Sequence, residues 1–186
     1  MSKKIAIYFP GIGYHCDKPL LYYGRDLLSE LGYEEYRNLK FEYQAGNIRG
    51  NDDKIRETFE VLYRQAEEQL ADMEWSMYED IVFVGKSIGT VVAAAYAQKQ
   101  GVSCRQILYT PLSLTFAYEP KDAFVLTGSK DPWVRDGEVV GLCEEHGIPY
   151  QVIAEANHSL EVPNVQENLQ ILTRVMELTR EYVLRM

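Results

Sequence analysis

A serine flanked by two glycines joins an apolar strand to a small-residue helix near the middle of the chain. Residues 81–84 are apolar and β-prone, and they run directly into Gly85-Lys86-Ser87-Ile88-Gly89. The alanine-rich residues 91–96 follow and favour a helix. Because glycine has no Cβ, strand and helix can approach closely around such a turn. A serine at this turn has a strained backbone and an exposed hydroxyl, so the pattern predicts that Ser87 is a nucleophile.

The same motif has two other interpretations. Ser87 could be a turn serine with a purely structural role. The motif could also end a phosphate-binding loop, but such a loop needs a glycine five positions before Gly85, where the chain has Asp80. The strand runs straight into Gly85 and leaves no loop to wrap a phosphate. The nucleophile is favoured, because suitable partners follow later in the chain.

Strands and helices alternate along the sequence. Most expected strands are continuous apolar runs, at residues 5–9, 81–84, 106–109, 123–127 and 150–154. Apolar and charged residues alternate over residues 39–43, which predicts an edge strand. Helical spacing or capping signals predict helices at residues 19–31, 51–73, 88–101, 135–146 and from about 164 onward. This alternation predicts an α/β fold, a three-layer αβα sandwich around a six-stranded, mostly parallel sheet.

The last helix carries two apolar rows and a capping signal. One row is Leu169, Leu172 and Met176, and the other is Ile171, Val175 and Leu178. Two rows predict a deeply packed helix. Asn164, followed three residues later by Glu167, resembles a capping box at its start.

Length, charge and cysteine content narrow the class of protein. A chain of 186 residues fits one domain, which we expect to span residues 1–186. The net charge of −9 disfavours nucleic acid and anionic membranes as partners. Cys16, Cys104 and Cys143 are far apart, as is typical of reduced thiols. Neither a signal-peptide pattern nor an apolar run of membrane-spanning length occurs, so we expect a cytoplasmic protein.

A nucleophilic serine needs a base, and the chain has three histidines. In parallel sheets, ligands bind beyond the carboxyl ends of the strands. His15 lies in the first loop, on the side where an oxyanion would be held. His146 would end a helix that returns to the opposite edge of the sheet. Only His158 follows the last strand at the required edge, so it is the candidate base.

The same argument selects the acid that orients the base. Asp131 follows the strand at residues 123–127, whereas Asp122 precedes that strand. Asp136 falls in or near the following helix. The candidate acid is therefore Asp131.

With these residues placed, the sequence resembles the α/β-hydrolase superfamily. The resemblance rests on Gly85-Lys86-Ser87-Ile88-Gly89, Gly128-Ser129-Lys130-Asp131-Pro132 and Asn157-His158-Ser159, each at the end of its expected strand. It covers nearly the whole chain and implies a serine hydrolase that acts through an acyl-enzyme, without metal or cofactor. In such an enzyme Ser87 attacks an acyl carbonyl, His158 transfers the proton and Asp131 holds the imidazole in the useful tautomer.

The resemblance also places an oxyanion hole. The glycine-rich loop at residues 10–14 occupies the family's oxyanion-loop position, so the expected donors are the N–H of Ile88 and one from Gly11, Ile12 or Gly13. The chain starts at what looks like the family's third strand, so the first hairpin is missing, and no insertion is long enough for a cap. Pro10-Gly11 stands where many members carry His-Gly. We expect a minimal α/β-hydrolase fold with an open site.

Several side chains near this edge are candidates for a substrate pocket: Tyr14, Lys86, Leu114, Phe116 and Trp133. The charge of Lys86 would favour an anionic substrate or tune the site, unless the side chain points to solvent. Cys143-Glu144-Glu145-His146 is better explained as a solvated helix end than as a metal site, because no second ligand pair is in view.

The expected function is hydrolysis of a small carboxylic ester or thioester. A hydrolase-like scaffold that binds a molecule without chemistry is one alternative, and acyl transfer by the same three residues is another. The expected partner is a small-molecule acyl substrate, and both a monomer and a homodimer remain open.

Overall fold

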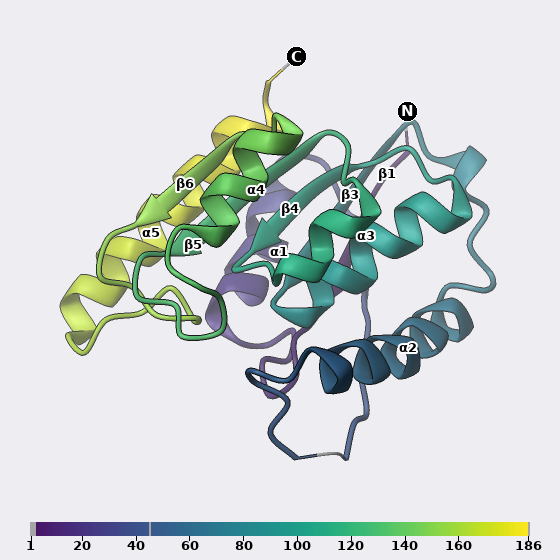
Figure 1. Ribbon diagram of the computed structural model, residues 1–186. Coiled ribbons are helices and arrows are strands. Elements are labelled where there is room, and N and C mark those ends of the chain that lie inside the picture. The colour runs from purple at the N-terminus through teal and green to yellow at the C-terminus, as the bar shows by residue number, and fades with distance from the viewer. Residues whose placement is uncertain (1–2, 45, 186) are drawn as a thin grey trace.

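The computed structural model describes residues 3–44 and 46–185, and within them six strands form one sheet (Figure 1). The strands are β1 (Lys4–Phe9), β2 (Glu35–Asn38), β3 (Asp80–Lys86), β4 (Arg105–Tyr109), β5 (Ala123–Gly128) and β6 (Tyr150–Ile153). Their order is β2-β1-β3-β4-β5-β6, and every neighbouring pair is parallel. The predicted six-stranded parallel sheet is confirmed.

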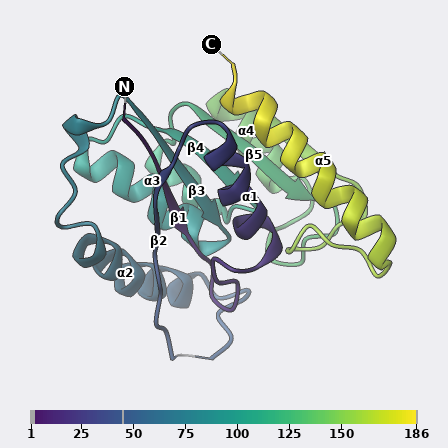
Figure 2. The same cartoon turned by 180° about the vertical axis from the view of Figure 1, so that it is seen from behind.

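Helices cover both faces of this sheet and make three layers (Figures 1 and 2). One face carries α1 (Pro19–Glu30) and α5 (Val165–Val183), and the other carries α2 (Asp52–Gln69), α3 (Ile88–Gln100) and α4 (Glu138–His146). In β3, Val82 and Val84 pack in the layer of α1 and α5, while Ile81 and Phe83 pack in the layer of α2 and α3. Both faces of the strand are buried, which explains its continuous apolar run.

The edge strand lies earlier in the chain than the alternation at residues 39–43 predicted. β2 ends at Asn38, which pairs with Tyr8 of β1. Beyond it, two glutamine side chains of α2 bond to the backbone. The Gln69 amide bonds to the N–H and the C=O of Lys40, each at 2.9 Å, and the Gln65 amide does the same for Glu42 at 2.9 and 2.8 Å. These amides take the place of a neighbouring strand, so the segment alternates without belonging to the sheet.

The last helix is less deeply packed than its two apolar rows predicted. Val175 and Leu178 are buried, but Leu169 is 55 % exposed. The row of Leu169 faces a surface groove against α1 rather than the sheet. At the start of the helix, the Asn164 side chain accepts a hydrogen bond from the N–H of Glu167 at 3.1 Å, which is one half of the predicted capping box.

Other element boundaries differ from expectation by a few residues. α2 ends at Gln69, and a short 3₁₀ helix, η1 (Trp75–Met77), follows it. The segment expected to be irregular, residues 112–122, contains a second 3₁₀ helix, η2 (Ser113–Tyr118). Among the described residues, no helix is both long enough and apolar enough to span a membrane.

Candidate active site

Ser87 occupies a sharp turn between the last residue of β3 and the first residue of α3. Its backbone has φ 56° and ψ −127°, a region that a serine rarely adopts and that costs about 1–3 kcal/mol. A Cβ added to Gly89 would lie 2.1 Å from the carbonyl oxygen of Phe9, and one added to Gly85 would lie 2.8 Å from Cα of Thr90. Both flanking glycines are therefore required for the close approach of β1, β3 and α3.

The structure brings Ser87, His158 and Asp131 together in one chain of hydrogen bonds. The Oγ of Ser87 lies 2.7 Å from Nε2 of His158. The Nδ1 of His158 lies 2.7 and 2.9 Å from the two carboxylate oxygens of Asp131. The Asp131 side chain is fully buried and the His158 side chain is 13 % exposed. These distances suit proton transfer from the hydroxyl to the imidazole.

Backbone contacts between two loops fix the acid next to the base. The N–H of Lys130 donates to the carbonyl of Ala156 at 2.9 Å, so the loops after β5 and β6 lie against each other. A Cβ on Gly128 would lie 2.2 Å from that same carbonyl oxygen, which requires glycine there. The N–H of Trp133 donates to Oδ1 of Asp131 at 2.9 Å and orients the carboxylate.

The histidine is held from three sides. The Thr110 hydroxyl donates to the carbonyl of His158 at 3.0 Å. The Asn157 side chain accepts from the N–H groups of Ser159 at 2.7 Å and Glu161 at 3.2 Å, which fixes the turn that carries His158. The Trp133 indole stacks on the ring of His158, with centroids 4.9 Å apart and planes 18° apart.

The electrostatics of the site favour a neutral imidazole. Burial lowers the pKa of His158 below its ordinary value, and the Lys86 ammonium lowers it further. The hydrogen bond and the charge of Asp131 oppose this shift. Near neutral pH the ring is therefore in the form that can accept a proton.

The glycine-rich loop lies directly against the nucleophile. Gly11 and Tyr14 exchange backbone hydrogen bonds of 3.1 and 3.2 Å, which places Ile12 and Gly13 at the tip of a tight turn. A Cβ on Gly11 would lie 3.1 Å from Cβ of Ser87, closer than ordinary van der Waals contact, so the loop packs tightly on the nucleophile. The N–H of Gly11 is already bonded to Tyr14, whereas no acceptor among the described residues is in range of the N–H of Ile12.

A cleft of about 670 Å³ adjoins the hydrogen-bonded residues at Trp133. Its walls come from the loop after β4, the loop after β5 and the start of α2, and they include Leu112, Leu114 and Ile55. The start of α2 is the part that sequence reasoning missed, because helical periodicity does not say where a helix end lies in space. Thr110 was missed as well, although its place at the end of β4 follows the rule that selected Asp131.

The candidate pocket residues fall into two groups. Leu114 and Trp133 line the cleft. Phe116 does not, because its side chain is 2 % exposed and packs in the core beside α4. Lys86 is 1 % exposed and points into the interior, and Tyr14 covers it with its ring.

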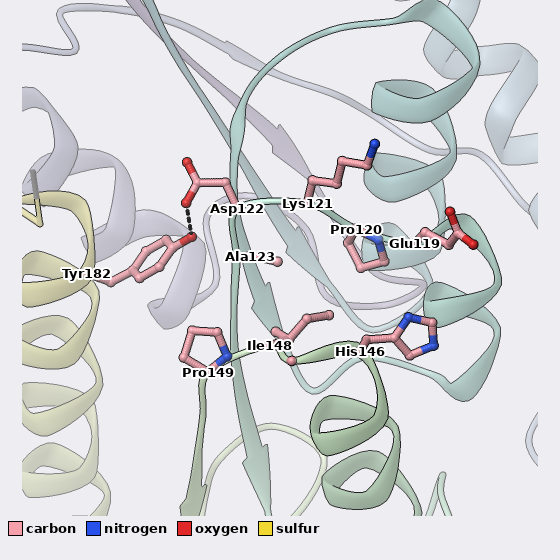
Figure 3. A pocket seen from close by; sticks show the side chains of 10 residues that line it. Glu119, Pro120, Lys121, Asp122, Ala123, His146, Ile148, Pro149 and Tyr182 are labelled. Carbon is pink, nitrogen blue, oxygen red and sulfur yellow. Dashed lines mark hydrogen bonds between the residues drawn. The ribbon is translucent and has the colours of Figure 1, made fainter.

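A second cavity, of about 440 Å³, lies at the opposite edge of the sheet (Figure 3). Its lining includes Lys121, His146 and Tyr182, whose hydroxyl donates to Asp122 at 2.8 Å. His146 is thus at the edge to which the sequence assigned it, away from Ser87. Within the described residues, no group of three His, Cys, Asp or Glu side chains is arranged to hold a metal ion.

Solved structures of α/β hydrolases share this architecture. No protein-family model and no curated protein matches the sequence. A serine hydrolase homologue from Coxiella burnetii has a TM-score of 0.65 at 20 % identity over 97 % of this chain and 85 % of that chain. An esterase from Pyrococcus furiosus gives 0.65 at 15 % identity over 98 % and 82 %. A lidless serine hydrolase from Xanthomonas campestris gives 0.62 at 15 % identity over 98 % and 82 %. The expected α/β-hydrolase fold without a cap is confirmed.

Proposed function

We propose that this chain, which has the α/β-hydrolase fold, is a serine hydrolase that cleaves a small carboxylic ester or thioester. The observation that carries the proposal is the unbroken hydrogen-bond chain from Ser87 through His158 to the buried Asp131, set on a strained turn. Structural neighbours described as a serine hydrolase homologue and an esterase support a hydrolase. Reaction through an acyl-enzyme follows from the residue types in this triad.

Acylation begins when the Ser87 hydroxyl attacks the acyl carbonyl carbon. Its proton moves to Nε2 of His158, 2.7 Å away, as the new C–O bond forms. The resulting imidazolium is stabilised by Asp131, which accepts the Nδ1–H. His158 then gives the proton to the leaving oxygen or sulfur, and a water molecule activated by the same imidazole hydrolyses the acyl-enzyme.

The oxyanion of the tetrahedral intermediate needs two donors near Ser87. The N–H of Ile88 is one, because the first N–H groups of a helix have no acceptor within it. The N–H of Gly11 already donates to Tyr14, so the second oxyanion donor is the N–H of Ile12 or of Gly13. Ile12 directly follows Gly11, which packs on Ser87. Each such donor contributes about 3 kcal/mol of transition-state stabilisation.

The cleft beside Trp133 is where the acyl group or the leaving group would lie. Leu112, Leu114 and Ile55 form an apolar part of its wall. The charged side chains of the lining form the rest: Asp52, Arg56, Arg135 and Glu138. A cleft that is only partly apolar favours small acyl substrates over long chains that need full apolar burial. We place this activity in the cytoplasm, where the sparse cysteines would stay reduced.

Hydrolysis of short p-nitrophenyl esters tests the proposal. The Ser87→Ala variant should lose at least about 10³-fold in kcat/KM, because it lacks the nucleophile. Ser103→Ala is the matched control, since Ser103 is an exposed serine at the other end of the sheet. A Ser87→Ala protein that hydrolyses the ester as fast as wild type would refute the proposal. Product formed only when an alcohol or amine is added would indicate acyl transfer instead.

A further inference from the structure

Lys86, the residue immediately before the nucleophile, has a buried ammonium group that the proposed reaction leaves unused. Along β3 its side chain falls on the same face as Val82 and Val84, toward α1 and α5. The residue is 1 % exposed. Within residues 3–44 and 46–185, its Nζ forms no ion pair with a carboxylate, and it lies over the ring of Tyr14. Burying a charge without a direct partner is costly, so a lysine here needs a reason.

The groups around Lys86 come from every element that ends at this edge. The loop after β1 supplies the Tyr14 ring, whose centroid is 4.9 Å from Nζ. β4 supplies Tyr109, which is opposite Lys86 in the sheet register. The loop after β5 supplies Asp131, and the loop after β6 supplies His158 and Glu161. Burial lowers the pKa of Lys86 to about 7, and the carboxylates of Asp131 and Glu161 oppose this shift.

We propose that Lys86 is a positioning residue, whose buried ammonium holds the glycine-rich loop against Ser87 through the Tyr14 ring and keeps the imidazole of His158 neutral. This inference rests on the proposed function for its effect on the rate. Its effect on His158 is a property of the folded protein alone.

The first role follows from the contacts of Tyr14. A cation over an aromatic ring is strongly attracted when both are shielded from water. The Tyr14 hydroxyl also accepts a hydrogen bond from the N–H of Leu20 at 3.1 Å, which ties the ring to the start of α1. The backbone of Tyr14 closes the turn with Gly11, and Gly11 packs on Ser87. Fixing the ring therefore fixes the N–H of Ile12, the candidate oxyanion donor.

The second role follows from charge. Lys86 directly precedes Ser87, whose Oγ lies 2.7 Å from Nε2 of His158, so its charge belongs to the same site. Of the charged groups that act on His158, Lys86 lowers its pKa and Asp131 raises it. His158 is protonated below its ordinary pKa, and in that pH range Lys86, with a pKa of about 7, keeps most of its charge. The ammonium thus disfavours a second positive charge on the imidazole and preserves the base form.

The test replaces Lys86 by methionine, which keeps an unbranched side chain of similar length but no charge. The His158 pKa is followed by NMR in a background with His15→Gln and His146→Gln, so that one imidazole is observed. In Lys86→Met we expect this pKa to rise by about 1 pH unit and the acidic limb of kcat/KM to move with it. Lys121→Met, at the opposite edge of the sheet, is the matched control and should leave both values at those of wild type.

A pair of Tyr14 variants tests the loop. Tyr14→Leu removes the ring, whereas Tyr14→Phe keeps it and removes only the hydroxyl. We expect Tyr14→Leu to lower kcat about 10-fold more than Tyr14→Phe, with similar KM, because the oxyanion donor is misplaced only without the ring. Equal losses in the two variants would overturn the positioning role.

The outcomes separate this inference from the proposed function. A folded Lys86→Met protein whose His158 pKa equals that of wild type would overturn the role of charge. Lys86→Gln supplies the same measurement if the methionine variant does not fold. A wild-type protein that hydrolyses no ester but shows the predicted rise in the His158 pKa would refute the hydrolase and leave the charge effect standing.

Discussion

Ser87 has a backbone conformation that a serine keeps only when its surroundings enforce it. The tight packing around Gly85 and Gly89 holds this conformation, because any side chain at these two positions would meet backbone atoms. The positions of Ser87, Asp131 and His158 could be predicted from the sequence, because each follows a recognisable strand at the same edge. The orientation of Lys86 could not be predicted. A lysine side chain is usually exposed to solvent, but β3 is buried on both faces, so Lys86 is buried as well.

The close approach at Gly89 predicts a large effect on stability. In Gly89→Ala, the new Cβ would meet the Phe9 carbonyl at 2.1 Å, and we expect a loss of about 2–4 kcal/mol in the free energy of unfolding. Gly141→Ala is the control, because a Cβ there meets nothing within 4 Å and alanine favours the α4 helix. Urea denaturation measures both. A Gly89→Ala protein as stable as wild type would show that the elbow is packed differently.

The lowered pKa of His158 predicts the pH dependence of the reaction. Only the neutral imidazole accepts the Ser87 proton, and its pKa lies below the ordinary 6.5. Below pH 7, where Lys86 mostly keeps its charge, activity should therefore be lost as pH falls through the lowered pKa of His158, about tenfold per unit. The measurement is kcat/KM against pH, with circular dichroism to verify the fold at each point. Half-loss of kcat/KM above pH 7 would contradict a depressed pKa.

At the scale of elements, the segment after β2 shows where periodicity alone misleads. Residues 39–43 have the alternation of an edge strand, and their apolar side chains do pack on the core. The N–H of Leu39 still donates to Tyr8 of β1, but the backbone groups of Lys40 and Glu42 bond to the amides of Gln69 and Gln65 on α2. Nothing in the sequence distinguishes a glutamine that bonds to a distant backbone from any other polar residue on an exposed helix face. The sequence therefore could not predict that side chains, rather than a strand, bond to this segment.

Removing one of these amides should lower the protection of the backbone against hydrogen exchange at that point. Gln69→Ala should free the N–H of Lys40, raise its hydrogen-exchange rate and cost about 1 kcal/mol of stability. Gln170→Ala, on an exposed position of α5, is the matched control and should change neither quantity. Exchange at Lys40 that is unchanged in Gln69→Ala would mean that the segment is held by something else.

For the whole molecule, parallel strand direction is what joins residues that are distant in the chain. Ser87 and His158 are 71 positions apart and meet because β3 and β6 end at the same edge. Continuous apolar strands and their order along the chain were enough to predict this edge. The cleft was not predictable, since its walls depend on how η2 and the start of α2 fold over the sheet.

The shared edge makes Ser87 a nucleophile, and labelling with a fluorophosphonate decides whether it is one. We expect one covalent adduct per chain, mapped to Ser87 by peptide mass spectrometry. It should be absent in Ser87→Ala and form much more slowly in His158→Ala. A folded protein that stays unlabelled, or an adduct on a different side chain, would contradict it.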